Sequence, residues 1–184
     1  IAALKLTNLL KTKKLGYFSQ PVRDRPVYRV IERIKPFSIV DLGVGDAVRA
    51  ERMLDLARRH CTDRIQYTGI GEFEAKPDGQ LSLKETYQRL STMPASVRLI
   101  PGNAFGALKS HANNLTGTDL LVIAHEQTGT PLQAAWYLVP RMLHNESLVL
   151  LQEAPDSDFV ELRFQDVQQR VDQSHLVALA VHSF

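Results

Sequence analysis

The residue types best suited to binding a ligand gather in one short stretch, Ile39 to Ala47, which reads IVDLGVGDA. An apolar run typical of a buried strand leads into two glycines, which let a backbone turn sharply and approach a ligand with no Cβ in the way. A helix expected to follow would point its free amide groups at the same place. In an open parallel sheet, this turn is where a nucleotide-like ligand binds. The pattern therefore predicts a ligand site at Gly43 and Gly45, although a tight turn that binds nothing would need the same glycines.

This stretch differs from the dinucleotide-binding fingerprint, because its sixth position is Val48 and because Asp41 is not part of that fingerprint. It resembles motif I, D-x-G-x-G-x-G, of the class I S-adenosylmethionine-dependent methyltransferases, with Ala47 in the last small position. The resemblance implies that Gly43 and Gly45 pack against the methionine part of the cofactor. It also implies that Asp41 helps to place the cofactor's amino group, directly or through water. A buried acid satisfied by backbone amides is the alternative for Asp41.

The resemblance extends over roughly residues 37 to 153 and departs from the family at two cofactor positions. The family usually has an acidic residue at the end of the second strand, where it accepts hydrogen bonds from the ribose. Here Gly71 holds that slot and Glu72 is the nearest acid. Asn103 stands where the family usually has an Asp for the adenine amino group, and Ala104 follows it. The resemblance thus implies Glu72 at the ribose and Asn103 and Ala104 at the adenine, with purely structural roles as the alternative.

His125 and Glu126 follow the fourth expected strand, the position from which many members of the family present catalytic side chains. A histidine there could act as a general base on a substrate hydroxyl or amine, so we predict a catalytic role for His125 and Glu126. The alternative is a loop histidine that only caps the sheet. Glu153 follows the fifth strand and opens onto the same edge. A metal site of these three residues is geometrically conceivable, but their spacing matches no strong ligand pattern and no metal is expected.

Two kinds of segment alternate after residue 36 and would position these residues. Longer amphipathic stretches separate short apolar runs, and this alternation predicts βαβ units and a parallel sheet. The expected fold is therefore α/β, a three-layer α/β/α sandwich with a mostly parallel, doubly wound sheet of six or seven strands. The expected strands are Ser38–Leu42, Ile65–Ile70, Val97–Ile100, Asp119–Ala124 and Leu148–Gln152, and the expected helices are Ala47–His60, Leu81–Leu90, Phe105–Ala112 and Leu132–Leu143.

The two ends of the chain are harder to interpret. Residues 22–34 have the apolar spacing of a leading helix, so residues 1–35 are expected to form a basic N-terminal arm and this helix. Residues 36–184 are expected to form a single Rossmann-like cofactor-binding domain. Phe159–Val171 fits either a strand or a helix, and we favour a helix followed by a last strand at Leu176–Ser183.

Composition and charge limit the classes of protein. A chain of 184 residues with 44% hydrophobic and 23% charged residues is typical of one globular domain, and a single cysteine excludes an internal disulfide framework. No apolar run approaches the roughly 18 residues that span a bilayer. The chain starts at Ile1, so a few residues are expected to precede it, and no complete signal peptide is evident. We expect a cytoplasmic protein.

The net charge of +2 hides an uneven distribution, because residues 1–35 carry +7 and the remainder carries −5. Such an arm would suit an anionic partner such as RNA, although it would equally pack on the acidic body of its own chain, the interpretation we favour. The sequence as a whole predicts an S-adenosylmethionine-dependent methyltransferase of small molecules, with S-adenosylmethionine as cofactor. The alternatives are a non-catalytic binding or scaffold protein on the same fold and an RNA-directed methyltransferase. A homodimer is among the expected assemblies.

Overall fold

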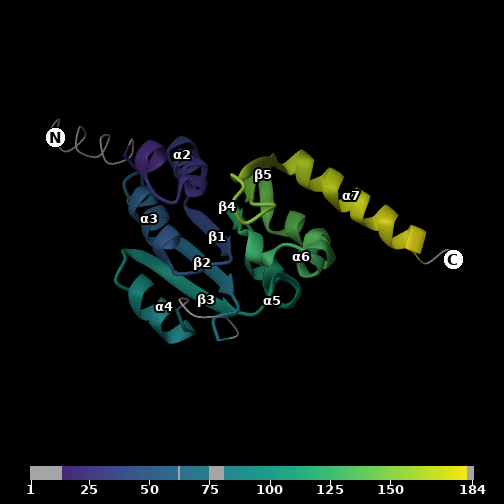
Figure 1. Cartoon of the computed structure of the whole chain (residues 1–184), viewed down its shortest axis with the longest axis horizontal. Coiled ribbons are helices and arrows are strands. Elements are labelled where there is room, and N and C mark those ends of the chain that lie inside the picture. Colours follow the sequence, from purple (N-terminus) through teal and green to yellow (C-terminus); the bar gives the residue numbers. More distant parts are fainter. Residues whose placement is uncertain (1–13, 62, 75–80, 182–184) are drawn as a thin grey trace.

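A computed structural model of the chain describes residues 14–61, 63–74 and 81–181, and within them a six-stranded sheet forms the centre of the molecule (Figure 1). The strand order is β3-β2-β1-β4-β5-β6, with β6 antiparallel to β5 and all other neighbours parallel. The first and fourth strands lie side by side at the centre, so their carboxyl ends meet. The strands are β1 (Ser38–Leu42), β2 (Ile65–Gly71), β3 (Ala95–Pro101), β4 (Thr118–Ile123), β5 (Leu143–Leu151) and β6 (Val160–Arg163).

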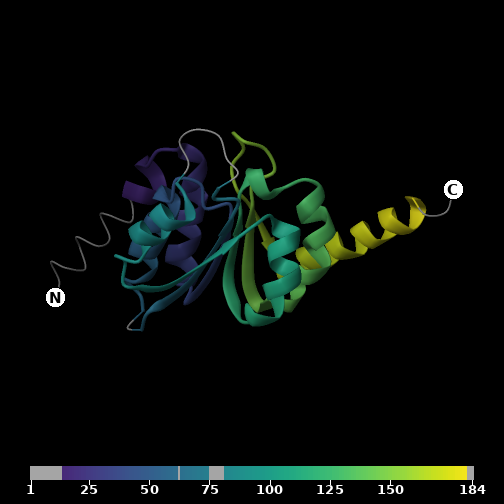
Figure 2. The same ribbon diagram turned by 90° about the horizontal axis from the view of Figure 1, so that it is seen from below.

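Helices cover both faces of this sheet, as expected for a doubly wound α/β fold (Figures 1 and 2). Alternate residues of the central strands face opposite layers, so that Ile39 packs in one apolar core and its neighbour Val40 in the other. One layer holds α2 (Arg25–Ile34), α3 (Val48–Ala57) and α4 (Leu83–Leu90), and the other holds α5 (Ala104–His111), α6 (Thr130–Ala135) and α7 (Phe164–Val181). The three-layer arrangement is therefore confirmed.

All five expected strands are present, although β5 begins earlier than predicted, at Leu143. Pro131 lies in the first turn of α6, where a proline is tolerated because its missing N–H has no partner there. The expected helix Leu132–Leu143 is wrong in its second half, because α6 ends at Ala135 and a 3-10 turn, Trp136–Arg141, follows. Pro140 inside that turn has no N–H to donate to an α-helix.

The prediction for the C-terminal region is wrong in two places. The segment predicted as one helix over Phe159–Val171 begins instead with β6, and Val149 pairs with Leu162 across the β5–β6 ladder. The last strand expected at Leu176–Ser183 is absent up to Val181, because α7 continues to that residue, and residues 182–184 lie outside the described part. Figures 1 and 2 both show α7 extending away from the sheet.

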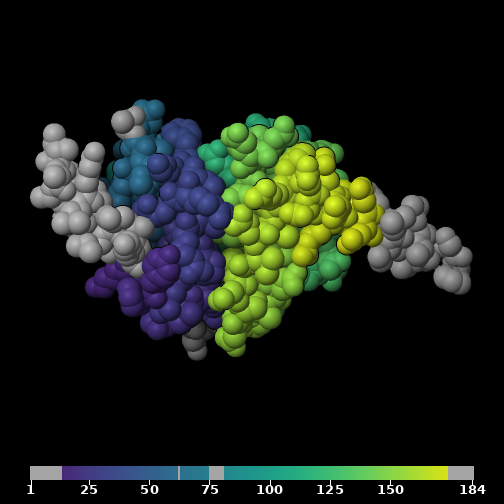
Figure 3. Space-filling view, turned by 90° about the horizontal axis from the view of Figure 1, so that it is seen from above, coloured from purple at the N-terminus to yellow at the C-terminus, as the bar shows by residue number. Residues whose placement is uncertain are grey.

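The described part of the N-terminal arm packs on the rest of the chain. Arg23 donates to the carbonyl oxygen of Pro155 at 2.7 Å, and Arg33 pairs with Glu161 at 2.6 Å. In Figure 3 the purple and blue N-terminal segments accordingly lie against the yellow-green segments that precede α7. The leading helix is confirmed as a 3-10 turn at Val22–Asp24 followed by α2, while residues 1–13 of the arm lie outside the described residues. Among the described helices, none combines the length and apolarity that crossing a membrane requires.

Candidate functional site

The turn between β1 and α3 has the backbone conformation that its glycines predict. Gly43 and Gly45 have φ angles of 95° and 62°, in the left-handed region that disfavours residues with a Cβ. The N–H of Gly43 donates to the carbonyl oxygen of Ile70 at 2.8 Å, which ties the turn to the end of β2. The N–H of Val48, at the start of α3, donates to Asp46 Oδ1 at 3.0 Å. One of the amides that would have faced a ligand is therefore already used within the turn.

The two glycines face different surroundings. A Cβ on Gly43 would lie 2.8 Å from the Cβ of Ala124 and 3.2 Å from Cδ of Glu126, so a side chain there would clash with the end of β4. A Cβ on Gly45 would have no neighbour closer than the Glu126 carboxylate oxygen at 3.8 Å. Gly43 thus permits close packing of the turn against the protein, and Gly45 leaves space open.

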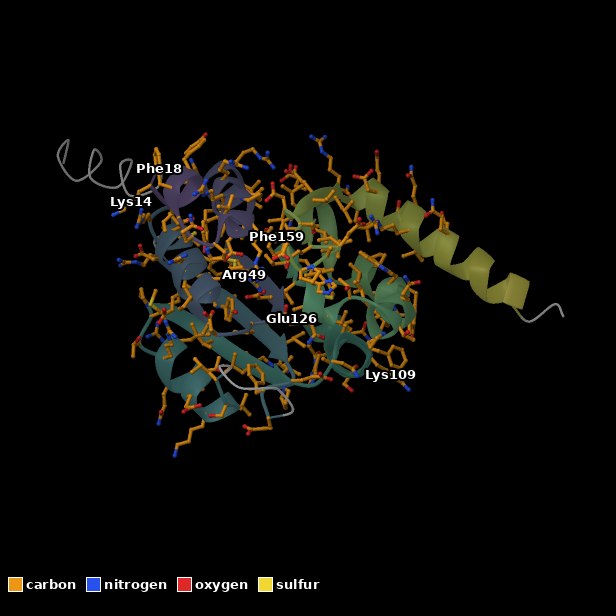
Figure 4. All side chains as sticks on the ribbon, in the orientation of Figure 1. Lys14, Phe18, Arg49, Lys109, Glu126 and Phe159 are labelled. Carbon is orange, nitrogen blue, oxygen red and sulfur yellow. The ribbon has the colours of Figure 1, made fainter. Side chains whose placement is uncertain are left out.

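That space belongs to a pocket of about 290 Å³ between the glycine turn, the ends of β4 and β5, and the N-terminal segment. We call it the glycine-turn pocket. It is lined by Pro21, Arg23, Asp24, Gly43, Val44, Gly45, Asp46, Val48, Arg49, Glu126 and Gln152. In Figure 4, Arg49 and Glu126 are close together near the centre of the view, whereas Lys14, Phe18 and Lys109 are distant from them.

Asp41 lies behind this pocket, where it is fully buried and forms an ion pair with Arg49. Its Oδ1 accepts a hydrogen bond from Arg49 Nη2 at 2.9 Å, and its Oδ2 accepts one from the Tyr67 hydroxyl at 3.0 Å. Burial raises the pKa of the Asp41 carboxyl, and the Arg49 guanidinium and the Tyr67 hydroxyl offset part of that rise. Both carboxylate oxygens accept hydrogen bonds within the protein, so Asp41 positions Arg49 beneath the turn.

Arg49 joins this buried pair to the pocket. The same Nη2 donates to the carbonyl oxygen of Gly43 at 2.5 Å, which fixes the shape of the turn. The guanidinium also stacks on the ring of Phe159, 5.5 Å from its centroid. One guanidinium therefore links the turn to β1 and to the loop before β6.

Asp24 contributes a second buried carboxylate from the N-terminal side. Only 5% of the residue is exposed, and burial raises its pKa above the usual value, while the nearby cations Arg49 and Arg23 lower it in part. With Asp46 and Glu126, the pocket has three carboxylates against the two guanidinium groups of Arg23 and Arg49. Because Arg49 is already paired with Asp41, the pocket favours a ligand with positive charge over a polyanion.

The residues expected at the nucleoside end lie at the same edge of the sheet but do not line this pocket. Glu72 follows β2 and is half-buried. Asn103 caps α5, with its Oδ1 accepting from the N–H of Gly106 at 2.9 Å, and Ala104 is buried in the core. The ring of Phe73 packs over Gly71, where a Cβ would lie 3.6 Å from Cζ. The Phe73 ring thus lies beside the end of β2.

His125 and Glu126 are neighbours in sequence, but their side chains contact different parts of the protein. Glu126 lines the glycine-turn pocket, whereas His125 Nδ1 lies 3.1 Å from the carbonyl oxygen of Glu153. A carbonyl can only accept, so this contact places the imidazole proton on Nδ1 and leaves Nε2 with its lone pair. Nε2 is therefore the nitrogen able to accept a proton. Among the described residues, no three His, Cys, Asp or Glu side chains come together as a metal would require.

Arg49 and Asp24, two charged residues that line the pocket, were not predicted from the sequence. A signal for Arg49 was available, because its spacing to Met53 and Leu56 puts it on the apolar face of α3. An arginine on such a face needs a buried partner, and Asp41 stands between two apolar residues of β1. Asp24 carried no comparable signal, because its burial depends on how the N-terminal segment folds over the sheet.

Comparisons with known proteins leave these residues to be interpreted on their own chemistry. No protein-family model matches the chain, and no curated protein has a matching sequence.

Proposed function

We propose that this chain is an S-adenosylmethionine-dependent methyltransferase that acts on a small molecule, and that the glycine-turn pocket holds the amino-acid end of the cofactor. One observation carries the proposal. The glycine turn at the carboxyl end of β1 lines a pocket, beside the end of β4, that also contains carboxylate groups and guanidinium groups. A zwitterionic amino-acid group needs both kinds of partner. A carboxylate-rich pocket also suits the positive charge of a sulfonium.

The chemistry of the pocket favours this ligand over a dinucleotide. A pyrophosphate would bring two negative charges beside Asp24, Asp46 and Glu126, and it would compete with Asp46 for the N–H of Val48. The open space at Gly45 is the cradle available to a ligand, because a Cβ there would have no neighbour closer than 3.8 Å. The residues present thus fit the amino-acid end of S-adenosylmethionine.

Each group then has a role of its own. Glu126 and Asp24 would bind the ammonium group, and Arg23 would pair with the carboxylate. When bound, the cofactor supplies an electrophilic methyl group. His125 would accept the proton of a substrate hydroxyl or amine at Nε2, while the Glu153 carbonyl holds the ring in that tautomer.

The Phe73 ring and the capping role of Asn103 favour a second candidate, a binding or scaffold protein that has the fold without the chemistry. In that case Glu72, Asn103 and Ala104 stabilise the ends of their own elements. The two candidates differ in one measurable property, the affinity for the cofactor. RNA-directed methylation stays a prediction, and Arg33 of the basic arm pairs with Glu161 of the chain itself.

Calorimetric titration with S-adenosylmethionine and with S-adenosylhomocysteine tests the proposal. We expect saturable binding, a higher melting temperature, and about tenfold weaker binding in Glu126→Gln, equivalent to about 1.4 kcal/mol. Glu161→Gln is the matched control, because it removes one carboxylate at an ion pair with Arg33 outside this pocket. Absence of both heat and thermal stabilisation at millimolar ligand would overturn the proposal in favour of the scaffold.

A further inference from the structure

A second pocket, of about 360 Å³, lies at the same edge of the sheet over the end of β5. We call it the Trp136 pocket. Its walls come from the loop before α6, from α6 itself, from the 3-10 turn that follows and from α7. The helices α6 and α7 lie on the same side of the sheet in Figure 1. No residue lining it also lines the glycine-turn pocket, so the two are separate sites.

The floor of the Trp136 pocket is apolar and contains a flat ring. Leu132 and Leu151 line it with Trp136, and all three are at least 95% buried. Trp136 is only 5% exposed, so it contributes a small apolar surface to the floor, against which a planar group can pack. The pocket therefore fits a small ligand with a planar apolar body.

An exposed ion pair stands over this floor. Arg170 Nη2 donates to Glu153 Oε1 at 2.9 Å, and the guanidinium lies over the Trp136 ring, 5.8 Å from its centroid. The Glu153 side chain is 57% exposed, and an exposed pair of this kind contributes little to stability. A ligand carboxylate can therefore displace Glu153 at little cost. It would gain two parallel hydrogen bonds, because a guanidinium presents a planar fork.

These contacts select one chemical class. A cationic ligand would have to displace Arg170 from both Glu153 and Trp136, whereas an anionic ligand needs only the more exposed Glu153 to move. We propose that the Trp136 pocket binds a small planar aromatic carboxylate, with its ring against Trp136 and its carboxylate on Arg170.

The pocket is also connected to His125. The Glu153 carbonyl oxygen accepts from Nδ1 of the His125 ring. The backbone N–H of His125 donates to Gln152 Oε1 at 3.3 Å. Gln152 lines the glycine-turn pocket and Glu153 lines the Trp136 pocket, so His125 lies between the two sites. The further assignment of this ligand as the methyl acceptor rests on the proposed function, but the binding site itself does not.

Fluorine NMR of the full chain without cofactor tests the site, with 4-fluorobenzoate as the probe and 4-fluorobenzamide as its neutral isostere. We expect saturable broadening of the benzoate signal at millimolar concentration or below, and binding of the benzamide at least tenfold weaker. Arg170→Gln should weaken benzoate binding about tenfold and remove the preference for the charged probe. Arg141→Gln is the matched control, since Arg141 stacks on Tyr137 at the same 5.8 Å but does not line the pocket.

Equal binding of both probes, no saturable binding of either, or an Arg170→Gln variant that binds like the parent chain would overturn this inference. Circular dichroism of each variant shows that a loss of binding is not a loss of fold. The outcome is independent of the proposed function, because the titration contains no S-adenosylmethionine. A chain that binds S-adenosylmethionine but not 4-fluorobenzoate would keep the proposed function and lose only this site.

Discussion

The ion pair between Asp41 and Arg49 stabilises the glycine turn from behind, and its burial makes it sensitive to the loss of either partner. Asp41→Asn leaves the Arg49 guanidinium, whose side chain is only 12% exposed, without its counter-ion. Removal of one partner of a buried pair costs about 3 to 5 kcal/mol, so we expect a loss of about 3 kcal/mol in the free energy of unfolding. Urea denaturation measures it.

Two further variants show whether charge is the cause. The double variant Asp41→Leu with Arg49→Met should recover much of the loss, because it removes both charges together. Arg33→Gln breaks an exposed pair and should cost less than about 1 kcal/mol. A double variant no more stable than Asp41→Asn would contradict this account.

Asp24 makes the stability of the fold depend on pH. Because burial raises its pKa in the folded protein, the unfolded chain releases this proton at a lower pH, near 3.8. Between the two pKa values the folded state binds more protons, so the contribution of Asp24 to stability falls as the pH rises through this range. We predict that Asp24→Asn gains stability relative to the parent chain as the pH rises from 3.5 towards neutrality. The measurement is the free energy of unfolding of both chains across this pH range, with the exposed Asp156→Asn as control. If the prediction is wrong, the difference in stability between Asp24→Asn and the parent chain will not change with pH.

At the scale of elements, the central strands were predictable and the C-terminal region was not. The strands β1, β2 and β4 are short apolar runs between helices, and a run buried on both faces has few alternatives. Val160, Leu162 and Phe164 fit a strand, while Val160, Phe164 and Val167 fit a helix, so periodicity alone could not decide. Pairing with β5 decides for the strand, and that is a tertiary contact. The glycine turn was predictable for the same reason as β1, whereas the buried Asp24 and the separation of His125 from Glu126 depended on the packing of distant segments.

A single side chain marks the change from β6 to α7. Asp166 Oδ2 accepts from the N–H of Arg163 at 2.7 Å, which satisfies an amide at the start of the helix. We predict that Asp166→Ala destabilises the chain by about 1 kcal/mol, the usual cost of a lost cap, and that hydrogen exchange accelerates first in residues 160–170. Asp172→Ala, an exposed acid further along α7, should leave the exchange of residues 160–170 unchanged. Equal protection in both variants would show that the cap is dispensable.

Across the whole molecule, one sheet couples two separate apolar cores. Met53 lies fully buried in the core beneath α2 and α3, and Leu108 lies fully buried in the core on the opposite face. The central strands contribute alternate residues to each, so neither core can lose its packing without disturbing the strands that serve the other. The chain should therefore unfold in one transition despite its two cores.

The single tryptophan gives a direct test of this coupling, because Trp136 lies in the core with Leu108. Met53→Ala should cost about 2 to 5 kcal/mol through the cavity that it leaves. This loss of stability should lower the midpoint of urea unfolding. The decrease measured by Trp136 fluorescence should equal the decrease measured by circular dichroism. Leu108→Ala should have the same effect on both signals. A Met53→Ala variant whose fluorescence midpoint stays unchanged would mean that the two layers unfold separately, and a ligand in the glycine-turn pocket would then stabilise only the layer beneath α2 and α3.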